Sequence, residues 1–321
     1  MQPLTIAVGD YPHAAPLLDG QAPIPGYTVK PVEVRPIIAA YRRMIRDLEF
    51  DVCELAPVSY LMAREAGVRL TAIPVFLNRR FHHGDIQCAP GSGITTPKDL
   101  QGRRVGVRAY SVSTGVWGRG VLAEEYGVDL ATLTWVIDDD DHVEGHVPAN
   151  VERVQDGRSL GSLLGAGAID AAFTGNAGTG RAGKPQAGWE ATGAQDAGGT
   201  YPLFPAADII EHDWYLRTGI YPLHSVVTVR TELVDRDPDL PTKLYAAFVT
   251  SKQLHAAQDP DFTTLPRLAK QRRKIGSDPI PYGLAANAAT IAAWERYTHA
   301  QGLVDSIAGR TLFADGDYPD R

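Results

Sequence analysis

Residues 96–108 read Thr-Pro-Lys-Asp-Leu-Gln-Gly-Arg-Arg-Val-Gly-Val-Arg, and residues 110–115 continue as Tyr-Ser-Val-Ser-Thr-Gly. Thr96 suits the N-cap of a helix, Pro97 its first helical position and Gly102 its exit. The Val-Gly-Val run that follows is typical of a short buried strand. The stretch therefore predicts a capped helix, a buried strand and a turn that opens a second helix.

The turn at residues 110–115 has the chemistry of an anion site. Hydroxyl side chains and a glycine lie where the second helix is predicted to begin, and N–H groups at a helix N-terminus attract carboxylates. An arginine at the end of the strand could grip a carboxylate with two hydrogen bonds. The pattern indicates a protein that holds a small acidic molecule, and the substrate-binding candidates here are Arg108, Tyr110, Ser111, Ser113, Thr114 and Gly115.

The same stretch resembles the start of the second lobe in the type II periplasmic-binding-protein fold, which carries a Pro-x-Asp-Leu-x-Gly-x-x-Val-x-Val segment. The resemblance implies an α/β protein with two lobes, each a mixed sheet flanked by helices, and a ligand cleft between the lobes. It implies a fold and not a function, because one fold supports many activities.

The composition excludes several classes of protein. The chain has 321 residues, 44% of them hydrophobic, and a net charge of −7 from 31 basic and 38 acidic residues. This length allows two domains, and the acidic balance argues against a nucleic-acid partner. No apolar stretch is long enough to span a membrane. The N-terminus lacks a basic leader, so we expect a cytoplasmic protein, with Cys53 and Cys88 as reduced, buried thiols.

Strand and helix patterns alternate along the chain, which predicts an α/β architecture. Lobe one is expected to be discontinuous, over residues 1–88 and 222–321, and lobe two to cover residues 89–221. The expected strands are residues 4–8, 27–34, 50–55, 70–76, 86–89, 133–137, 168–173 and 225–230. The expected helices are residues 37–48, 57–66, 116–126, 240–258 and 285–301.

Two segments of lobe two are expected to be irregular. Residues 174–200 hold eight glycines in 27 residues, which predicts a mobile loop, either a lid over the cleft or a disordered surface insertion. The acidic segment at residues 138–146 contains two histidines four residues apart, but Gly145 and Pro148 argue against the helix that would align them. We therefore favour a solvated acidic loop over a metal site there.

Two groups of histidines are placed beside the predicted crossings between the lobes. His82 and His83 follow two arginines and a phenylalanine, and His224 precedes the last strand of lobe one. A histidine can donate or accept a proton near neutral pH, and neighbours in an extended chain face opposite sides. The competing interpretation is two surface histidines at 82–83 and a structural histidine at 224.

Several further residues complete the candidate site. Arg80 and Arg217 flank these histidines and are alternatives to Arg108 as the carboxylate anchor, as is Arg79. Tyr11 and Glu54 belong to the substrate-binding candidates. We expect no cofactor, and a divalent metal stays an alternative because His82 adds a ligand beside His83, with Asp85 and Glu54 as carboxylates.

Segments through most of the chain together resemble the 4,5-dihydroxyphthalate decarboxylase family. The resemblance implies a binding-protein fold used for catalysis inside the cell, with a small aromatic carboxylate as substrate and protocatechuate as product. The segments are residues 16–20, Leu-Glu-Phe-Asp at 48–51, Ala-Ile-Pro-Val-Phe at 72–76, Arg-Phe-His-His-Gly at 80–84, 103–107, Val-Trp-Gly-Arg-Gly at 116–120 and Arg-Thr-Gly-Ile-Tyr-Pro at 217–222.

The chain departs from that family pattern at two positions. Residues 81–83 read Phe-His-His where the family is expected to have Phe-Arg-His, so His83 matches and His82 is additional. Ser225 stands where a histidine is expected, one place after His224. Under the resemblance, His83 is the acid that protonates the ring carbon, and His224 orients or deprotonates the ring hydroxyl.

Two other functions remain open from the sequence. One is a non-catalytic small-carboxylate-binding protein for transport or sensing, which a cleft without clustered histidines would favour. The other is a different enzyme on the same fold, similar to those of the menaquinone pathway, which a large apolar pocket would favour. The sequence leaves the oligomeric state open between a monomer and a homo-oligomer.

Overall fold

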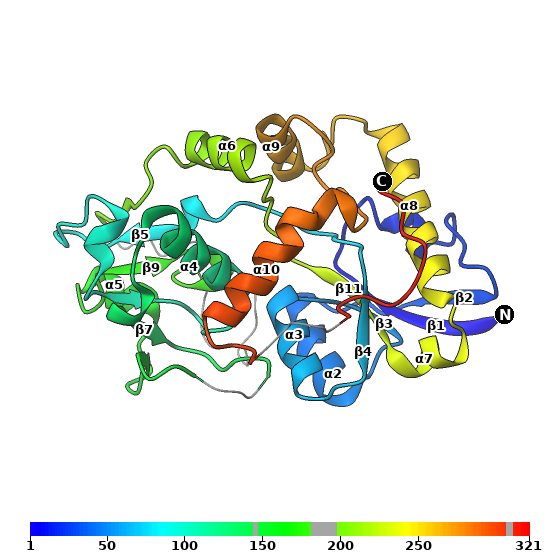
Figure 1. Cartoon of the computed structure of the whole chain (residues 1–321), viewed down its shortest axis with the longest axis horizontal. Helices are drawn as coiled ribbons and strands as arrows, with labels where there is room; N and C mark the ends of the chain where they lie inside the picture. The colour runs from blue at the N-terminus through cyan, green and yellow to red at the C-terminus, as the bar shows by residue number, and fades with distance from the viewer. Residues whose placement is uncertain (144–146, 181–197, 306–310) are drawn as a thin grey trace. The chain divides into compact units, whose positions relative to one another are not determined.

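The computed structural model in Figure 1 describes residues 1–143, 147–180, 198–305 and 311–321. The chain divides into two compact units. Unit 1 consists of Met1–Arg80, Trp214–Trp294 and Ser306–Arg321, and unit 2 consists of Phe81–Asp213 and Glu295–Asp305. The chain crosses between the units after residues 80 and 213, a few residues before the expected crossings after residues 88 and 221. Residues 295–305, near the C-terminus, belong to unit 2.

Unit 1 is built on a five-stranded sheet with the strand order β2-β1-β3-β11-β4. β1 is parallel to β2 and β3, whereas β11 runs antiparallel to β3 and β4. The return of β11 to the middle of this sheet confirms that the first unit is discontinuous. The strands are β1 (Gln2–Ala7), β2 (Tyr27–Pro31), β3 (Val52–Leu55), β4 (Leu70–Ile73) and β11 (Val226–Arg230).

Helices cover the sheet of unit 1 because their apolar faces need burial. On α2, Tyr41, Met44 and Ile45 are buried at helical spacing, and this helix packs on β3 while α3 packs on β4 (Figure 1). The helices are α1 (Ala15–Leu18), α2 (Ile38–Asp47), α3 (Pro57–Glu65), α7 (Thr231–Arg236), α8 (Leu240–Gln258), α9 (Pro266–Ile275) and, in its N-terminal part, α10 (Ala288–Ala300), which follows the 3₁₀ turn η6 (Ala285–Asn287).

Unit 2 contains a six-stranded sheet with the order β10-β5-β9-β6-β7-β8. β5 pairs antiparallel with β9 and β10, so residues 86–88 belong to this unit and not to lobe one, where the sequence places them. The strands are β5 (Ile86–Cys88), β6 (Arg104–Gly106), β7 (Thr134–Ile137), β8 (Val151–Arg153), β9 (Ala171–Phe173) and β10 (Tyr201–Pro202).

Unit 2 also contains helices and short 3₁₀ turns, which lie next to its candidate site residues in the sequence. The helices are α4 (Ser113–Tyr126), α5 (Leu160–Gly165) and the first part of α6 (Ala207–Thr218). The 3₁₀ turns are η1 (His83–Asp85), η2 (Pro97–Leu100), η3 (Leu130–Thr132) and η4 (Gly175–Ala177). Most of the glycine-rich stretch, residues 181–197, lies outside the described residues.

The predicted capped helix after residue 96 is a 3₁₀ turn, η2. Thr96 and Asp99 form a reciprocal capping box, in which the Thr96 N–H donates to an Asp99 carboxylate oxygen at 2.7 Å. Hydrogen bonds from the Thr95 and Thr96 backbones lower the pKa of Asp99 to about 2. The N-cap prediction is therefore confirmed, although the turn is too short for an α-helix.

The sequence Gly118-Arg119-Gly120 in α4 is explained by close packing. A Cβ at Gly118 would lie 2.5 Å from the Phe173 ring, and one at Gly120 would lie 2.1 Å from the Tyr297 ring. Arg119 between them is fully buried and donates from Nε to the Gln301 amide oxygen at 2.6 Å. Small residues at 118 and 120 thus let α4 approach β9 and α10 around a buried cation.

Among the helices in the described parts of the chain, none has the length and hydropathy that a bilayer crossing requires.

We predict that Gly120→Ala lowers the free energy of unfolding by about 1–3 kcal/mol, because the new methyl group overpacks against Tyr297. Gly161→Ala in α5 is the matched control, since its Cβ would meet nothing closer than the Thr179 carbonyl oxygen at 3.4 Å. Urea unfolding of both variants checks this, and equal stability of the two would contradict the packing explanation.

Candidate active site

The turn between β6 and α4 binds a carboxylate that belongs to the chain itself. The Ser111 backbone N–H and the Ser111 hydroxyl donate to Asp141 Oδ1 at 2.8 and 2.5 Å. Ser111 is buried, and α4 begins two residues later at Ser113. The turn therefore has donors in an arrangement that satisfies one carboxylate oxygen, as expected for an anion site at a helix N-terminus.

Arg108, which precedes this turn, contacts the acidic segment that contains Asp141. Arg108 is 3% exposed, and its Nη1 lies 3.7 Å from Asp139 Oδ2. The Arg108 carbonyl accepts hydrogen bonds from the Asp138 and Asp139 N–H groups at 3.2 and 2.8 Å. Since Asp139 and His142 are buried, the expectation of a solvated acidic loop is wrong for this part of the segment. Residues 144–146, including His146, lie outside the described residues.

The first residues of α4 are buried inside unit 2. Ser113 and Thr114 are 2% and 1% exposed, and among the described residues the Ser113 hydroxyl has no hydrogen-bond partner. A Cβ at Gly115 would lie 3.0 Å from Val107 and 3.1 Å from the Arg119 guanidinium. Glycine at 115 therefore allows the helix to start close to β6.

His83 is the first residue of η1 in unit 2, His82 immediately precedes it, and both are 2% exposed. His82 Nδ1 lies 2.8 Å from Asp85 Oδ2, so this carboxylate orients its ring. The His83 ring packs edge-on against Phe204, with 5.6 Å between ring centroids. The alternative of two surface histidines is therefore wrong, because both rings are buried.

The arginines that are candidates for binding a carboxylate lie in different surroundings. Arg79 is fully buried, donates to Asn287 Oδ1 and the Tyr221 carbonyl, and lies 4.3 Å from the centroid of the Tyr221 ring. Burial lowers its pKa to about 10. Arg217 is exposed on α6, and Arg80 is half-buried at the end of unit 1. Arg79 thus binds protein groups through its guanidinium, as Arg108 does through Asp139.

A buried carboxyl group, Glu54 on β3, is the polar centre of unit 1. It is 1% exposed, and it accepts hydrogen bonds from the Gly9 N–H at 2.9 Å, the Tyr11 hydroxyl at 2.9 Å and the Tyr41 hydroxyl at 3.3 Å. The Ser225 side chain also hydrogen-bonds to it. Burial raises the pKa of Glu54, and these donors partly offset the rise.

The network extends from Glu54 through Tyr11 to Asn78 and Arg267. Burial and the nearby Glu54 charge raise the pKa of Tyr11 well above 10, while the Arg267 charge and a hydrogen bond with Asn78 oppose this. Arg267 donates to the Asn78 amide oxygen. The backbone N–H of His224, which is half-buried, donates to the Asn78 carbonyl at 2.9 Å.

Four members of this network are not among the site residues that the sequence predicts: Tyr41, Asn78, Ser225 and Arg267. In the sequence, Ser225 stands out only as the residue at a position where a histidine is expected. In the structure, its hydroxyl accepts a hydrogen bond from the Asn78 N–H at 3.0 Å, and its side chain also hydrogen-bonds to Glu54. A hydroxyl-bearing tyrosine on the apolar face of α2 was the available signal for Tyr41. Asn78 and Arg267 gave none, because they are far apart in the sequence.

The structure also bears on the thiols and on metal binding. Cys53 and Cys88 are buried and unpaired, and burial raises the pKa of both, that of Cys88 to about 11.

In the ranges that the structure describes, no group of three or more histidine, cysteine, aspartate or glutamate side chains is arranged to hold a metal ion. The expectation of no cofactor stays a prediction.

We predict that the Glu54 carboxyl destabilises the protein increasingly as pH rises above 4.5, its ordinary pKa. A raised pKa in the folded state means that protonated Glu54 is favoured there, so its contribution is complete below pH 4.5 and is lost as pH rises through the folded pKa. Glu54→Gln cannot ionise. The unfolding free energy of the wild type minus that of Glu54→Gln should therefore fall between pH 4.5 and 8 in urea titrations.

Glu49→Gln is the control, because a hydrogen bond from Arg43 lowers the pKa of the exposed Glu49. Its difference from the wild type should not fall with rising pH. A flat or rising difference for Glu54→Gln would show that its donors outweigh burial.

Solved structures with the same fold include both an enzyme and a binding protein. The desulfurization enzyme DSZB shares 16% sequence identity and a TM-score of 0.52, covering 95% of this chain and 94% of that one. The sulfonate-binding protein SsuA from Methylobacillus flagellatus KT shares 15% identity and a TM-score of 0.51, covering 98% and 90%. These likenesses show the periplasmic-binding-protein-like fold.

Sequence comparisons identify the family. The model of the phosphonate-binding periplasmic component of ABC transporters matches residues 26–182. A 4,5-dihydroxyphthalate decarboxylase from Comamonas testosteroni is 33% identical over 94% of this chain and 92% of its own length. One from Pseudomonas putida is 34% identical over 53% of this chain and 69% of its own. The chain therefore belongs to the 4,5-dihydroxyphthalate decarboxylase family, a family of carboxy-lyases.

Proposed function

We propose that this protein removes one carboxyl group from a hydroxylated aromatic diacid, 4,5-dihydroxyphthalate or a close relative, and that 4,5-dihydroxyphthalate gives protocatechuate. The observation that carries the proposal is the turn at Ser111, which satisfies a carboxylate oxygen with an N–H and a hydroxyl group. Two buried histidines, His82 and His83, lie in the same unit. The named activity of the two relatives supports the same reaction.

Decarboxylation of an electron-rich phenol needs no electron-sink cofactor. A base removes the proton from the ring hydroxyl para to the departing carboxylate. An acid adds a proton to the ring carbon that bears this carboxylate. The bond between that carbon and the carboxylate then breaks. Its electron pair restores the aromatic ring, carbon dioxide leaves, and the hydroxyl regains its proton. The site must therefore hold the second carboxylate and supply a proton donor near neutral pH.

In this proposal unit 2 binds the second carboxylate and provides the acid. Ser111 donates two hydrogen bonds to a carboxylate oxygen, and the Arg108 guanidinium adds positive charge near the turn. His83 protonates the ring carbon. His82, whose ring Asp85 orients, is the alternative proton donor.

Two further candidates from the sequence, Tyr11 and His224, lie in unit 1. His224 keeps the role that the sequence predicts, as the group that orients or deprotonates the hydroxyl. Tyr11, whose hydroxyl donates to Glu54, offers a fixed oxygen for a second hydroxyl. The Glu54 network holds this tyrosine in one orientation and limits its ionisation.

A non-catalytic small-carboxylate-binding protein is the second candidate. The match of residues 26–182 to the phosphonate-binding component of transporters favours it. The two candidates differ in one measurable property, because a binding protein would be stabilised by the diacid without releasing carbon dioxide.

We predict that the purified protein releases carbon dioxide from 4,5-dihydroxyphthalate and that His83→Ala lowers kcat by about 10²–10⁴-fold, the usual contribution of a general acid. His224→Ala should lower kcat as well. Carbon dioxide release and ring absorbance, each with and without a chelator, measure the effect. His212→Ala on α6 is the control and should keep wild-type turnover. Full turnover by His83→Ala would contradict its role, and stabilisation without turnover would favour the binding protein.

A second prediction concerns Asp141, which competes for the donors of Ser111. A substrate carboxylate that binds this turn must displace the Asp141 carboxylate. Asp141→Asn weakens the competitor, because hydrogen bonds to a neutral acceptor are weaker than those to a charged one. The KM for the diacid should therefore fall, by roughly three- to tenfold.

Asp140→Asn is the matched control, since it removes the same charge one residue away. Asp140 is exposed and pairs with Arg153 at 2.7 Å. Its KM should change little. A rise in KM for Asp141→Asn would show that Asp141 supports the substrate and does not compete with it.

A further inference from the structure

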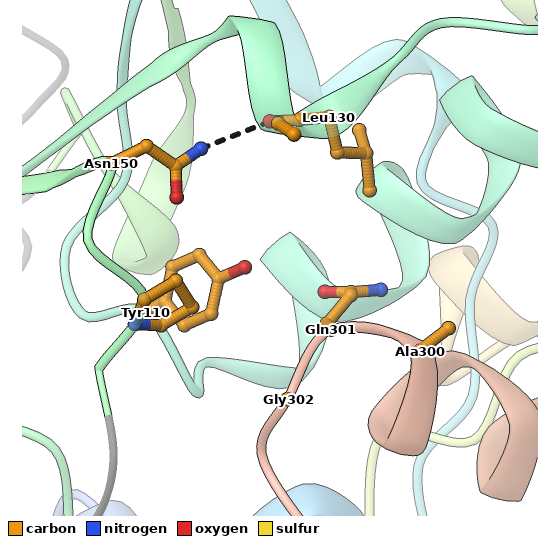
Figure 2. A pocket seen from close by; sticks show the side chains of 8 residues that line it. Tyr110, Leu130, Asn150, Ala300, Gln301 and Gly302 are labelled. Carbon is orange, nitrogen blue, oxygen red and sulfur yellow. Dashed lines mark hydrogen bonds between the residues drawn. The ribbon is translucent and has the colours of Figure 1, made fainter.

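Unit 2 contains a cavity that the proposed carboxylate site does not use. Its volume is about 300 Å³, at the small end of the range for small-molecule pockets. Figure 2 shows it between the end of α10, the turn η3 and the segment before β8. The residues that line it are Tyr110, Leu130, Ala131, Pro148, Asn150, Ala300, Gln301 and Gly302.

Tyr110 directs an unused hydroxyl group into this cavity. The residue is 4% exposed, its carbonyl accepts a hydrogen bond from Arg119, and the Arg119 guanidinium lies 4.0 Å from the centroid of its ring. Its hydroxyl points into the cavity (Figure 2), and within the described ranges no residue hydrogen-bonds to it. The hydroxyl is therefore available to a molecule in the cavity, with which it can donate or accept a hydrogen bond.

Asn150 supplies a second polar atom in a fixed orientation. Its Nδ2 donates to the carbonyls of Leu130 and Leu133, at 3.0 and 2.8 Å. Both amide hydrogens are therefore used, which fixes Oδ1 as an acceptor on the cavity side (Figure 2). An occupant must donate a hydrogen bond to this oxygen.

The remaining residues of the cavity wall disfavour a charged ligand. None of the eight lining residues is charged. The Gln301 amide is satisfied by the protein, because Oε1 accepts from Arg119 Nε at 2.6 Å and Nε2 donates to the Val116 carbonyl at 2.8 Å. The remaining lining side chains are aliphatic. A carboxylate would find no counter-charge among these lining residues.

We propose that this cavity is a second ligand site of the protein and that it binds a neutral phenol or catechol. The ligand hydroxyl donates to Asn150 Oδ1 and accepts from the Tyr110 hydroxyl. Its ring packs against Leu130, Pro148 and the Tyr110 ring, which favours a flat aromatic group. The site takes rings without a carboxylate, in contrast to the turn at Ser111, and its existence does not depend on the proposed function.

The test is isothermal titration calorimetry with catechol, phenol and cyclohexanol, in the presence of saturating phthalate. Phthalate fills a carboxylate site but lacks the ring hydroxyls that the reaction uses. One catechol or phenol should bind per chain under these conditions. Tyr110→Phe should weaken binding roughly three- to tenfold, the effect of one lost hydrogen bond.

Ala131→Phe is a second variant, which fills the cavity from its rim without touching the polar groups. It should abolish catechol binding and keep the turnover of 4,5-dihydroxyphthalate seen in the wild type. Catechol binding that phthalate removes and Ala131→Phe leaves intact would place the ligand elsewhere and overturn the proposal. The absence of binding, or cyclohexanol binding as tightly as phenol, would also overturn it.

Discussion

A carboxyl group that is removed from water needs N–H and O–H donors, and two carboxyl groups with such donors, Glu54 and Asp141, organise the two units. In unit 1, Glu54 receives hydrogen bonds from segments near residues 9–11, 41 and 225. In unit 2, Asp141 receives them from the turn at Ser111. The backbone of each unit is held by these contacts near its candidate site residues.

The two carboxylates differ in what can replace them. Glu54 is fully buried and belongs to β3, so its donors serve to fix Tyr11 and Ser225. Asp141 is half-buried on an irregular segment, and its two donors come from a turn at the start of α4. An external carboxylate can therefore take the place of Asp141 at lower cost than it could take the place of Glu54. This difference is the physical basis for assigning the substrate carboxylate to unit 2.

The sequence predicted much of the fold because local patterns decide it. The strands over residues 52–55 and 226–230 and the helices over 57–65 and 240–258 follow directly from apolar spacing and proline positions. The crossing near residue 80 was misplaced, since only the pairing of β5 with β9 assigns residues 86–88 to unit 2. The Ser111 turn was predictable as an anion site, but its pairing with Asp141 was not. That contact joins residues thirty positions apart, and no local pattern encodes it.

The most direct measurement is a crystal structure of the His83→Ala variant with 4,5-dihydroxyphthalate, in which slow turnover preserves the complex. The account predicts that one substrate carboxylate accepts hydrogen bonds from the Ser111 N–H and hydroxyl, and that Asp141 has moved away from them. A complex in which Asp141 still binds Ser111 while both substrate carboxylates lie elsewhere would contradict it.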